Sequence, residues 1–415
     1  MRFLYTLFIL LYQWAAKIYG LFNIKARQWA FGRKGLTARI VRENEEQQEY
    51  IWFHCASLGE FEMGRPVMEA ILNKYPRYKL LLTFFSPSGY EHRKNYKPAH
   101  RVYYLPSDTP QNARTFINTF QPVLAVFIKY EFWYNYFREL KRHNIPLILI
   151  SAVFRNDQPF FRWYGAWFRK QLNLIDHIYT QDDASANFLE KINYKNFTIA
   201  GDTRFDRVME TAEKAEDIDL IRHFAGEAKL IVAGSTWPAD EEIILPAMNT
   251  LPENIKLVIA PHQVDENHIS RIVEMIKEPV ARYTKVDPNQ IGSYRVLVID
   301  TIGILSRTYK YAWIAYVGGA FGSGLHNILE PAAFGVPVVF GPDHQKFHEA
   351  GKLVSKGGAF SIKNHKEFLK IVNGFLDNPE YYSQTCTDVR NFMREHRGAS
   401  RIIMKDLEKF LADQE

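Results

Sequence analysis

The sequence predicts an α/β protein with two Rossmann-like domains and a membrane-associated helix at its N-terminus. Short apolar runs alternate with amphipathic stretches through most of the chain, which is typical of parallel sheets covered by helices on both faces. The polar segment from Asp206 to Asp219 divides these runs into two blocks. Residues 1–42 differ from both blocks in charge and hydropathy.

Length and composition fit this organisation. The 415 residues are enough for about two to three domains. The chain is 47% hydrophobic and 24% charged, a balance that allows sizeable buried cores. Its two cysteines, Cys55 and Cys386, are too few for a disulfide framework or a cysteine metal cluster, so we expect a reducing compartment and no metal site.

The positive charge is concentrated in an N-terminal arm, residues 1–42. The arm contains eight lysines and arginines and no acidic residue. Its charge is therefore +8, and because the whole chain is +6, the rest carries −2 (6 − 8). The body shows no basic excess, so we expect no nucleic acid partner.

The arm begins with an apolar run that predicts a membrane anchor or interfacial helix at residues 1–24. Residues 3–16 contain only two polar side chains, Thr6 and Gln13, but Lys17 interrupts the run. A spanning helix needs about 20 apolar residues in succession, so a helix lying in the membrane interface fits better. A buried N-terminal helix is the alternative. The acid-free basic flanks favour membrane attachment because anionic lipids attract them.

Past the arm, apolar runs predict twelve strands and an amphipathic helix over Arg390–Leu411 that closes the chain. We place the two domains at residues 25–205 and 206–415. The predicted strands are Ile51–His54, Lys79–Phe84, Val102–Leu105, Val123–Phe127, Leu147–Ser151, His177–Thr180, Phe197–Ala200, Leu230–Ala233, Leu257–Ala260, Val296–Ile299, Ile314–Val317 and Val336–Phe340. Ligands of such sheets bind beyond the carboxyl ends of the strands, so the loops at those ends are the candidate sites.

The glycine-rich segment Gly318–Pro331 follows one predicted strand and leads into a short helix. Glycines leave backbone N–H groups open to a ligand, and a helix begins there with its positive end. Asn327 and Glu330 stand at that helix start, so the segment fits a nucleotide's phosphate and ribose. The alternative is a capped turn, because Asn-x-x-Glu also resembles a capping box.

The loop after the first predicted strand ends in Glu60. A carboxylate there faces the ligand-binding edge and could take a proton from an attacking hydroxyl. The pattern Ser57-x-x-Glu60 is also a capping box, and spacing alone does not decide between the two.

Two further loops and one linker motif have chemical meaning. Ser235 and Thr236 can offer hydroxyl and backbone donors to a phosphate. His262 is a lone histidine after another strand, and such a residue is more often structural than a ligand. Asp217 and Asp219 match an Asp-x-Asp metal motif, but they lie in a charged linker and read as solvated surface.

These motifs together resemble the 3-deoxy-D-manno-octulosonic acid (Kdo) transferase family over nearly the whole chain. The order that carries the resemblance is HCASLGE, SPSG, KYEFW, GDTRFD, GST, APH, DTIGIL, YVGG and HNILEPA. The resemblance implies a GT-B glycosyltransferase whose two domains face a central cleft, the first binding the acceptor and the second CMP-Kdo. It implies inverting, metal-independent transfer of Kdo from CMP-Kdo to a lipid A precursor, lipid IVA, in lipopolysaccharide biosynthesis, with no cofactor. The implied location is the cytoplasmic face of the cell inner membrane, in contact with its lipids.

By position, the resemblance makes Glu60 the general base and gives Lys129 and Arg204 roles in stabilising the transition state. The family often has a carboxylate where Lys129 stands, and nearby Glu131 retains one. It often has a Lys where Arg204 stands, an Arg in place of His262 and a Glu in place of Ile304. The residues that match CMP-contacting segments are Pro261, His262, Gly303, Ile304, Leu305, Asn327, Ile328, Leu329 and Glu330.

Two other functions remain open at this stage. A GT-B enzyme that uses another nucleotide sugar would share the fold and the glycine loop. A non-catalytic, membrane-anchored nucleotide-binding module would keep the second-domain loops but would not need Glu60.

Overall fold

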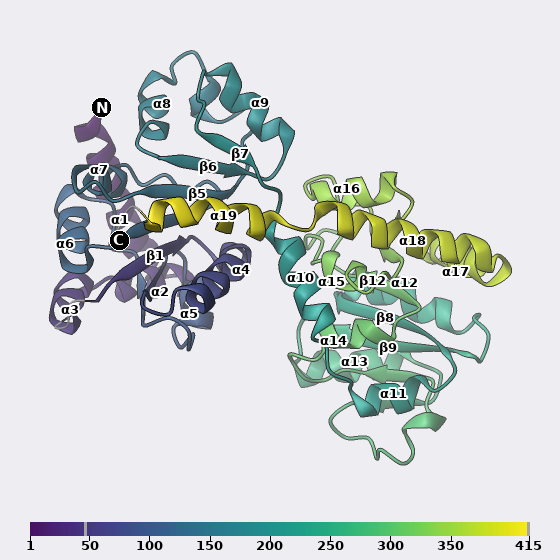
Figure 1. Ribbon diagram of the computed structural model, residues 1–415. Helices are drawn as coiled ribbons and strands as arrows, with labels where there is room; N and C mark the ends of the chain where they lie inside the picture. The colour runs from purple at the N-terminus through teal and green to yellow at the C-terminus, as the bar shows by residue number, and fades with distance from the viewer. Residues whose placement is uncertain (45–47, 413–415) are drawn as a thin grey trace. The chain divides into compact units, whose positions relative to one another are not determined.

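Each half of the chain builds one parallel sheet of seven strands, shown in the computed structural model of Figure 1, which describes residues 1–44 and 48–412. The first sheet has the order β3-β2-β1-β4-β5-β6-β7, and its neighbouring strands pair in parallel. Its strands are β1 (Tyr50–Cys55), β2 (Lys79–Phe84), β3 (Arg101–Tyr104), β4 (Leu124–Ile128), β5 (Leu147–Ala152), β6 (His177–Thr180) and β7 (Phe197–Ile199).

The second sheet has the order β10-β11-β9-β8-β12-β13-β14 and is also parallel. Its strands are β8 (Lys229–Thr236), β9 (Ile255–Pro261), β10 (Val280–Arg282), β11 (Val296–Val298), β12 (Ile314–Val317), β13 (Val338–Phe340) and β14 (Ala359–Ser361). Strands such as β1 and β5 are buried along their whole length, as expected when both faces of a sheet are covered.

All twelve predicted strands are present, with ends within two residues of the prediction except at β8, which runs three residues further, to Thr236. The sequence missed β10 and β14, which lie at the two edges of the second sheet. Each has three residues of which only one is buried, so neither forms the continuous apolar run that predicts a strand.

Helices cover both faces of each sheet. The chain divides into unit 1, Met1–Arg207 with Arg397–Glu415, and unit 2, Val208–His396. The helices that lie in unit 1 or begin in it are α1 (Arg2–Tyr19), α2 (Ile24–Gly32), α3 (Leu36–Glu43), α4 (Leu58–Lys74), α5 (Pro87–Arg93), α6 (Pro110–Phe120), α7 (Tyr134–Arg142), η1 (Pro159–Phe161), α8 (Ala166–Leu172), α9 (Asp183–Lys191), α10 (Thr203–Glu213) and α19 (Ala399–Ala412). Those of unit 2 are α11 (Asp219–Ala225), α12 (Pro238–Met248), α13 (Glu266–Met275), η2 (Ile291–Ser293), α14 (Leu305–Thr308), η3 (Tyr309–Tyr311), α15 (Leu329–Ala332), α16 (His348–Ser355), α17 (His365–Asp377) and α18 (Pro379–His396).

The C-terminal end of the chain differs from the prediction in two ways. The single helix expected over Arg390–Leu411 is two helices, α18 and α19, separated at Gly398, which has φ +118°. The N–H groups of Gly398 and Ser400 donate to Asp206, which caps the start of α19. The sequence placed all of residues 206–415 in the second domain, whereas residues 397–415 belong to unit 1. The reason is apolar packing, because α19 buries Ile403, Leu407 and Leu411 in the first sheet's core beside α4.

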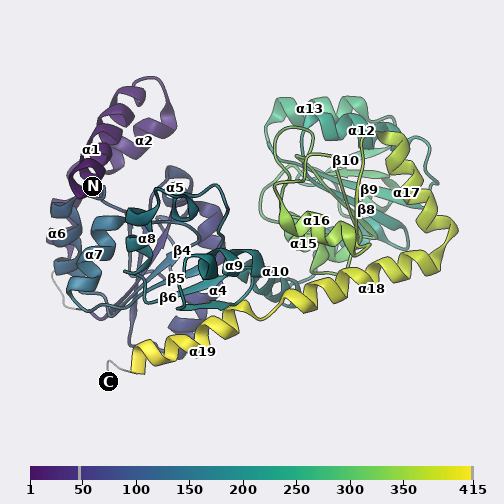
Figure 2. The same cartoon turned by 90° about the horizontal axis from the view of Figure 1, so that it is seen from above.

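The predicted N-terminal helix is α1, and it is oriented with its apolar side outward. Figure 2 shows α1 and α2 as a helical hairpin standing out from the rest of unit 1. Of the α1 side chains only Ile9 is buried, so the alternative of a buried helix is wrong. The polar atoms of Thr6 and Gln13 are buried against the body. The exposed residues include Phe3, Leu4, Phe8, Leu11 and Trp14.

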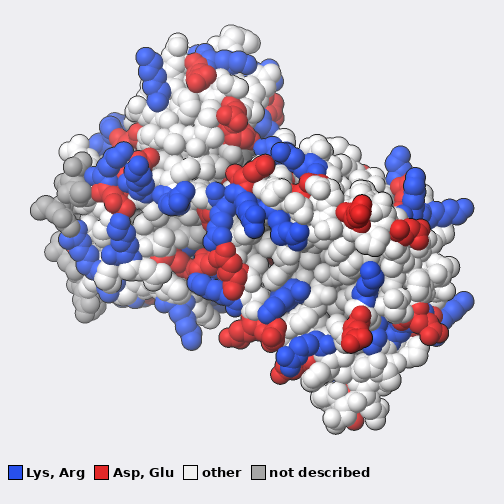
Figure 3. Space-filling model, turned by 45° about the vertical axis from the view of Figure 1, so that its right-hand side comes forward, with Lys and Arg blue, Asp and Glu red and all other residues white. Residues whose placement is uncertain are grey.

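Within the described residues, no helix combines the length and hydropathy needed to cross a bilayer. On the face shown in Figure 3, acidic and basic side chains are interspersed rather than segregated. This distribution agrees with the small net charge of the chain outside the arm.

Candidate active site

The strand order of the first sheet reverses between β1 and β4, and this is where an open parallel sheet offers a ligand site. The loop after β1 leads directly to Glu60 in the first turn of α4. The loop after β4 contains Lys129 and Glu131. Because β1 and β4 are hydrogen-bonded neighbours, the topology brings these predicted site residues to one edge of the sheet.

Glu60 is a buried carboxyl group with an altered acidity. Its side chain is 5% exposed, and its Oε2 accepts a short hydrogen bond from the Ala56 N–H. Burial and then the charge of Glu131 raise its pKa to about 8, against the opposing effects of the Ala56 N–H and Lys129. Glu60 therefore accepts a backbone N–H at the helix start, as a capping residue does, and is also poised to exchange a proton near neutral pH.

A hydrogen-bonded cluster holds Glu131. The Trp133 Nε1–H lies 3.1 Å from both Glu131 Oε2 and His54 Nε2. Because the indole N–H can only donate, His54 Nε2 accepts and the imidazole proton sits on Nδ1, 2.9 Å from Thr83 Oγ1. Burial lowers the pKa of His54, so a neutral ring backs the carboxylate.

Sequence reasoning gave no role to His54, Thr83 or Trp133. Two signals were present, because His54 and Thr83 are polar residues inside runs that otherwise predict fully buried strands. A buried polar side chain in such a run needs a partner, and here the partners are each other.

Lys129 begins the β4 loop in a left-handed conformation, with φ +68°. For a residue other than glycine this conformation costs roughly 1–3 kcal/mol and is found disproportionately at functional sites. The Lys129 ammonium lies 5.1 Å from the centre of the Tyr130 ring and its charge lowers the pKa of Glu60. The positive charge at this position, opposite to what the resemblance led us to expect, thus acts on the predicted base.

The residues next to Arg204 connect it to α4, the helix that carries Glu60. The Arg204 side chain donates to Asp202 Oδ2 at 2.8 Å. The adjacent Thr203 is buried, donates to the Met63 carbonyl at 2.6 Å and lies 2.9 Å from Ser151 Oγ. Since Met63 follows Glu60 by less than one turn of α4, these contacts hold the start of α10, which contains Arg204, beside the helix that carries the carboxylate.

In unit 2, four adjacent strands carry the predicted donor-binding residues. The sheet order β11-β9-β8-β12 places their carboxyl-end loops side by side, with the reversal of strand order between β8 and β12. The carboxyl ends of these strands and the segments that follow them contain, in that order, Gly303, Ile304 and Leu305; Pro261 and His262; Ser235 and Thr236; and Asn327, Ile328, Leu329 and Glu330. A side chain at Gly234 would collide with Leu305 and Tyr309, so the β8 and β11 loops are in close contact.

Three rings meet at this edge. The His262 ring stacks on Trp237 at 4.8 Å and on His326 at 4.5 Å between ring centres. The Trp237 Nε1–H donates to His326 Nε2 at 3.0 Å. Burial and neighbouring His262 lower the pKa of His326 to about 4. His262 is therefore part of an aromatic cluster, whose members Trp237 and His326 the sequence did not single out.

Asp240 holds the glycine loop in its conformation through the hydrogen bonds that its carboxylate accepts. Its carboxylate accepts from the N–H groups of Trp237 and Gly319, both at 2.9 Å, and from the Tyr316 hydroxyl at 2.7 Å. Gly318 has no room for a side chain, because a Cβ would lie 2.4 Å from the Ser235 carbonyl oxygen. Asp240 was not predicted, although the helix-start pattern of Pro238 followed by an acid could have indicated it.

Two of the segments predicted to contact the donor nucleotide also make hydrogen bonds within the protein. The Thr236 hydroxyl is buried and donates to Glu241 Oε1 at 3.0 Å. At the start of α15, Asn327 Oδ1 accepts from the Leu329 N–H at 3.2 Å and its Nδ2 donates to Glu330 Oε1 at 3.1 Å. The capped-turn alternative is thus present in the geometry, and a ligand role for Glu330 stays a prediction.

Comparison with known proteins places this site in a family. The family model described as 3-Deoxy-D-manno-octulosonic-acid transferase (kdotransferase) matches residues 31–207, which include Glu60, Lys129, Glu131 and Arg204. Residues 31–207 are therefore similar to the Kdo transferase family. The resemblance found in the sequence is confirmed.

Relatives extend the similarity to most of the chain. It is 26% identical over 366 residues to the 3-deoxy-D-manno-octulosonic acid transferase of Chlamydophila psittaci, covering 84% of this chain and 82% of the relative. It is 28% identical over 326 residues to the Aquifex aeolicus protein of the same name, covering 77% and 84%. These relatives are named as glycosyltransferases that act on Kdo, and the chain is an enzyme of that class.

A solved structure supports the fold. The UDP-GlcNAc 2-epimerase from Neisseria meningitidis has a TM-score of 0.62 and 17% identity, and the match covers 87% of this chain and 100% of that one. At this identity the likeness concerns the fold alone. The two seven-stranded parallel sheets give the chain a GT-B-like fold.

Proposed function

We propose that this enzyme transfers Kdo from CMP-Kdo to a lipid A precursor, lipid IVA, with inversion at the anomeric carbon. Family membership supports Kdo transfer in lipopolysaccharide biosynthesis. The observation that carries the finer proposal is Glu60, a buried carboxyl group with a pKa of about 8 at the β1–β4 edge of a Kdo transferase family domain.

In the proposed reaction, an acceptor hydroxyl oxygen bonds to the anomeric carbon of Kdo while the bond from that carbon to the CMP phosphate breaks. The hydroxyl proton passes to the Glu60 carboxylate, and CMP leaves with the electron pair. Lys129 and Arg204 supply positive charge for the phosphate oxygens that become more negative. Burial, and after it the charge of Glu131, keep the pKa of Glu60 high, which makes Glu60 a stronger base once it has lost its proton.

The second unit is the proposed CMP-Kdo-binding part. The backbone N–H groups of the glycine loop suit the phosphate, and the carboxylate of Glu330 suits the ribose hydroxyls. The ring of His262, packed on Trp237 and His326, offers an aromatic surface beside them.

The proposed location is the cytoplasmic face of the inner membrane. The outward apolar side of α1, with the acid-free basic arm, suits a helix lying in the membrane interface. Replacing the exposed Phe8 by Glu should weaken sedimentation with anionic vesicles. The matched control Ile199→Glu, at an exposed position on β7, should not. Equal sedimentation of both variants would remove α1 from the membrane contact.

The experiment that tests the reaction is product analysis by mass spectrometry. Purified enzyme is incubated with a tetraacylated lipid A precursor and either CMP-Kdo or a panel of UDP-sugars. The proposal expects the acceptor to gain mass in Kdo increments with CMP-Kdo alone. Gain from a UDP-sugar would favour another nucleotide-sugar specificity, and binding of CMP-Kdo without any product would favour the non-catalytic module.

A further inference from the structure

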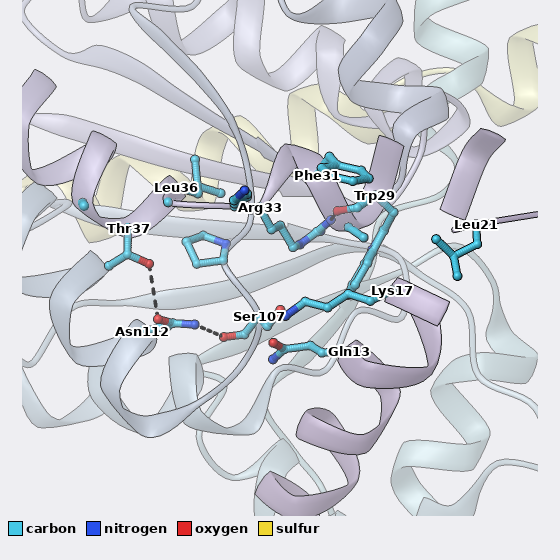
Figure 4. Close-up of a pocket in the computed structure, with 15 residues that line it drawn as sticks. Gln13, Lys17, Leu21, Trp29, Phe31, Arg33, Leu36, Thr37, Ser107 and Asn112 are labelled. Carbon is cyan, nitrogen blue, oxygen red and sulfur yellow. Dashed lines mark hydrogen bonds between the residues drawn. The ribbon is translucent and has the colours of Figure 1, made fainter. Parts of the chain in front are cut away.

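A pocket of about 580 Å³ lies in unit 1 between α1, α2, the start of α3 and the loop before α6 (Figure 4). Its volume is within the range of small-molecule sites, roughly 300–1,000 Å³. The residues that decide its chemistry are Gln13, Lys17, Trp29, Phe31, Arg33 and Lys34. Neither the family comparison nor the proposed active site assigns this pocket a ligand.

The wall of the pocket is positively charged. Lys17, Arg33 and Lys34 line it, and its lining within the described chain contains no carboxylate. A pocket with three cations and no acid is matched by an anion rather than by a neutral or cationic ligand.

Arg33 makes this charge costly in the absence of an anion. Its guanidinium donates to the carbonyls of Phe85 at 2.7 Å, Leu105 at 2.9 Å and Trp29 at 3.1 Å. It also lies 4.2 Å from the Trp29 ring and 4.9 Å from the Tyr104 ring. Burial lowers its pKa to about 9, and no ion pair joins it to any described carboxylate. A buried cation without a counter-charge is unfavourable, so a bound anion would be stabilised here.

Two buried donors on the same wall have no acceptor. Trp29 is 7% exposed, and its Nε1–H makes no hydrogen bond with any described residue. The Nε2 group of Gln13 is in the same state. Buried polar groups are nearly always paired, so two unpaired donors lining one cationic pocket indicate a ligand with several acceptor oxygens.

The rest of the lining is apolar. Leu21, Phe31 and Leu36 complete the wall, and Leu21 and Phe31 are among the exposed hydrophobic residues that continue from α1. A ligand that satisfies both parts has an anionic oxygen-rich group joined to a hydrocarbon chain. We propose that this pocket binds the phosphate group and the first part of an acyl chain of a phosphorylated lipid.

Such a phosphate can come from a bilayer phospholipid or from a phosphorylated lipid acceptor, the second source resting on the proposed function. A chain of rings connects the pocket to the candidate active site. Trp29 packs on Phe85 at 5.7 Å, and Phe85 packs at 4.9 Å on Trp133, which donates to Glu131. Two aromatic contacts therefore separate the pocket from Trp133, which holds the catalytic candidate Glu131. An acceptor phosphate bound in the pocket would lie against the first of these rings, Trp29.

The test uses the full-length enzyme and dioctanoyl phosphatidic acid, a short-chain soluble phospholipid, in calorimetric titrations below its micelle concentration. We expect saturable binding that weakens about ten- to a hundredfold in Lys34→Gln and in Trp29→Phe, each of which removes a donor to the phosphate. The matched control is Lys97→Gln, which removes an exposed lysine that does not line the pocket and should leave the affinity unchanged. Lys34 is exposed, so its variant should fold normally, which a thermal melt checks.

Two results would overturn the proposal. One is equal affinity of wild type, Lys34→Gln and Trp29→Phe for dioctanoyl phosphatidic acid. The other is equal binding of dioctanoylglycerol, which has the acyl chains and no phosphate. Competition between the bound phospholipid and the lipid A precursor in transfer assays would identify the acceptor as the source. Binding without competition would identify a bilayer lipid, and either result is independent of whether the donor is CMP-Kdo.

Discussion

The two sheets share a parallel architecture and a reversal of strand order, yet their carboxyl-end edges differ in chemistry. The edge of unit 1 gathers two carboxyl groups, Glu60 and Glu131, beside the cation Lys129, and the pKa of Glu60 is raised to about 8. The edge of unit 2 gathers backbone donors in a glycine loop and a cluster of rings around His262. The first edge is equipped for proton transfer and the second for holding a ligand.

The same difference is visible in one buried carboxyl group from each unit. Asp240 is fully buried and accepts from two backbone N–H groups and one hydroxyl, so its oxygens are engaged in shaping a loop. Burial raises the pKa of Asp240, as it does for Glu60, but Glu60 also faces the charge of Glu131. Burial alone therefore does not mark a reactive carboxyl group, whereas burial beside a second charge does.

The largest expected effect comes from Glu60→Gln. If Glu60 is the base, transfer should fall by about 10²–10⁴-fold, because a general base typically contributes that much to the rate. Thermal stability at about pH 4.5 and below should stay near normal, as should CMP binding, since the amide retains the size and the oxygen that accepts the Ala56 N–H. A variant that retained most of its transfer rate would leave Glu60 as a helix cap and remove the contrast between the two edges.

Glu330→Ala tests the opposite edge. We expect CMP affinity to fall about ten- to a hundredfold, the loss of one charge-assisted hydrogen bond, measured by calorimetry on the folded variant. Asn327→Ala is the matched comparison, because it removes the cap on the Leu329 N–H and leaves the Glu330 carboxylate. Unchanged CMP affinity in Glu330→Ala would make that carboxylate only a partner of Asn327.

Asp240→Ala should reduce the free energy of unfolding by about 2–4 kcal/mol, because two N–H groups and one hydroxyl lose their acceptor in a buried position. Denaturant unfolding measures this change. CMP affinity should fall as well if the glycine loop holds the phosphate. If Asp240→Ala loses stability but keeps its full affinity for CMP, the conformation of the glycine loop does not determine ligand binding.

The smallest expected effect is on pH dependence. The pKa of Glu60 is raised from 4.5 to about 8, so the carboxylate needed as base accumulates as pH rises. Transfer should increase about tenfold between about pH 7 and about pH 9. Glu131→Gln should move the midpoint to lower pH because it removes the like charge, and a midpoint unmoved by this change would contradict the coupling.

The raised pKa of Glu60 also predicts how the stability of the protein depends on pH. A carboxyl group whose folded pKa is raised contributes stability below its unfolded pKa that is lost as pH rises through the folded pKa. Wild type should therefore lose stability relative to Glu60→Gln from about pH 4.5 to about pH 8, which thermal melts of both proteins would measure.

Local features of the sequence determined the strands, the loops that follow them and the charge of the N-terminal arm. Buried parallel strands are continuous apolar runs, so β1 and β4 could be read directly, and Glu60 could be placed just after β1. The edge strands β10 and β14 lack such runs and could not. The motif order also predicted the family, since motifs keep their order along a chain whatever the fold does.

Tertiary structure alone decided what these segments meet. The neighbourhood of Glu60 and Glu131 depends on β1 lying beside β4, and a pKa depends on that neighbourhood and on burial. The packing of α19 on unit 1 and the partnership of Trp237 with His326 join segments far apart in sequence. The arm is the clearest case, because its sequence gives an amphipathic helix, but only packing shows that the polar side faces the body and leaves Gln13 and Trp29 unpaired around one pocket.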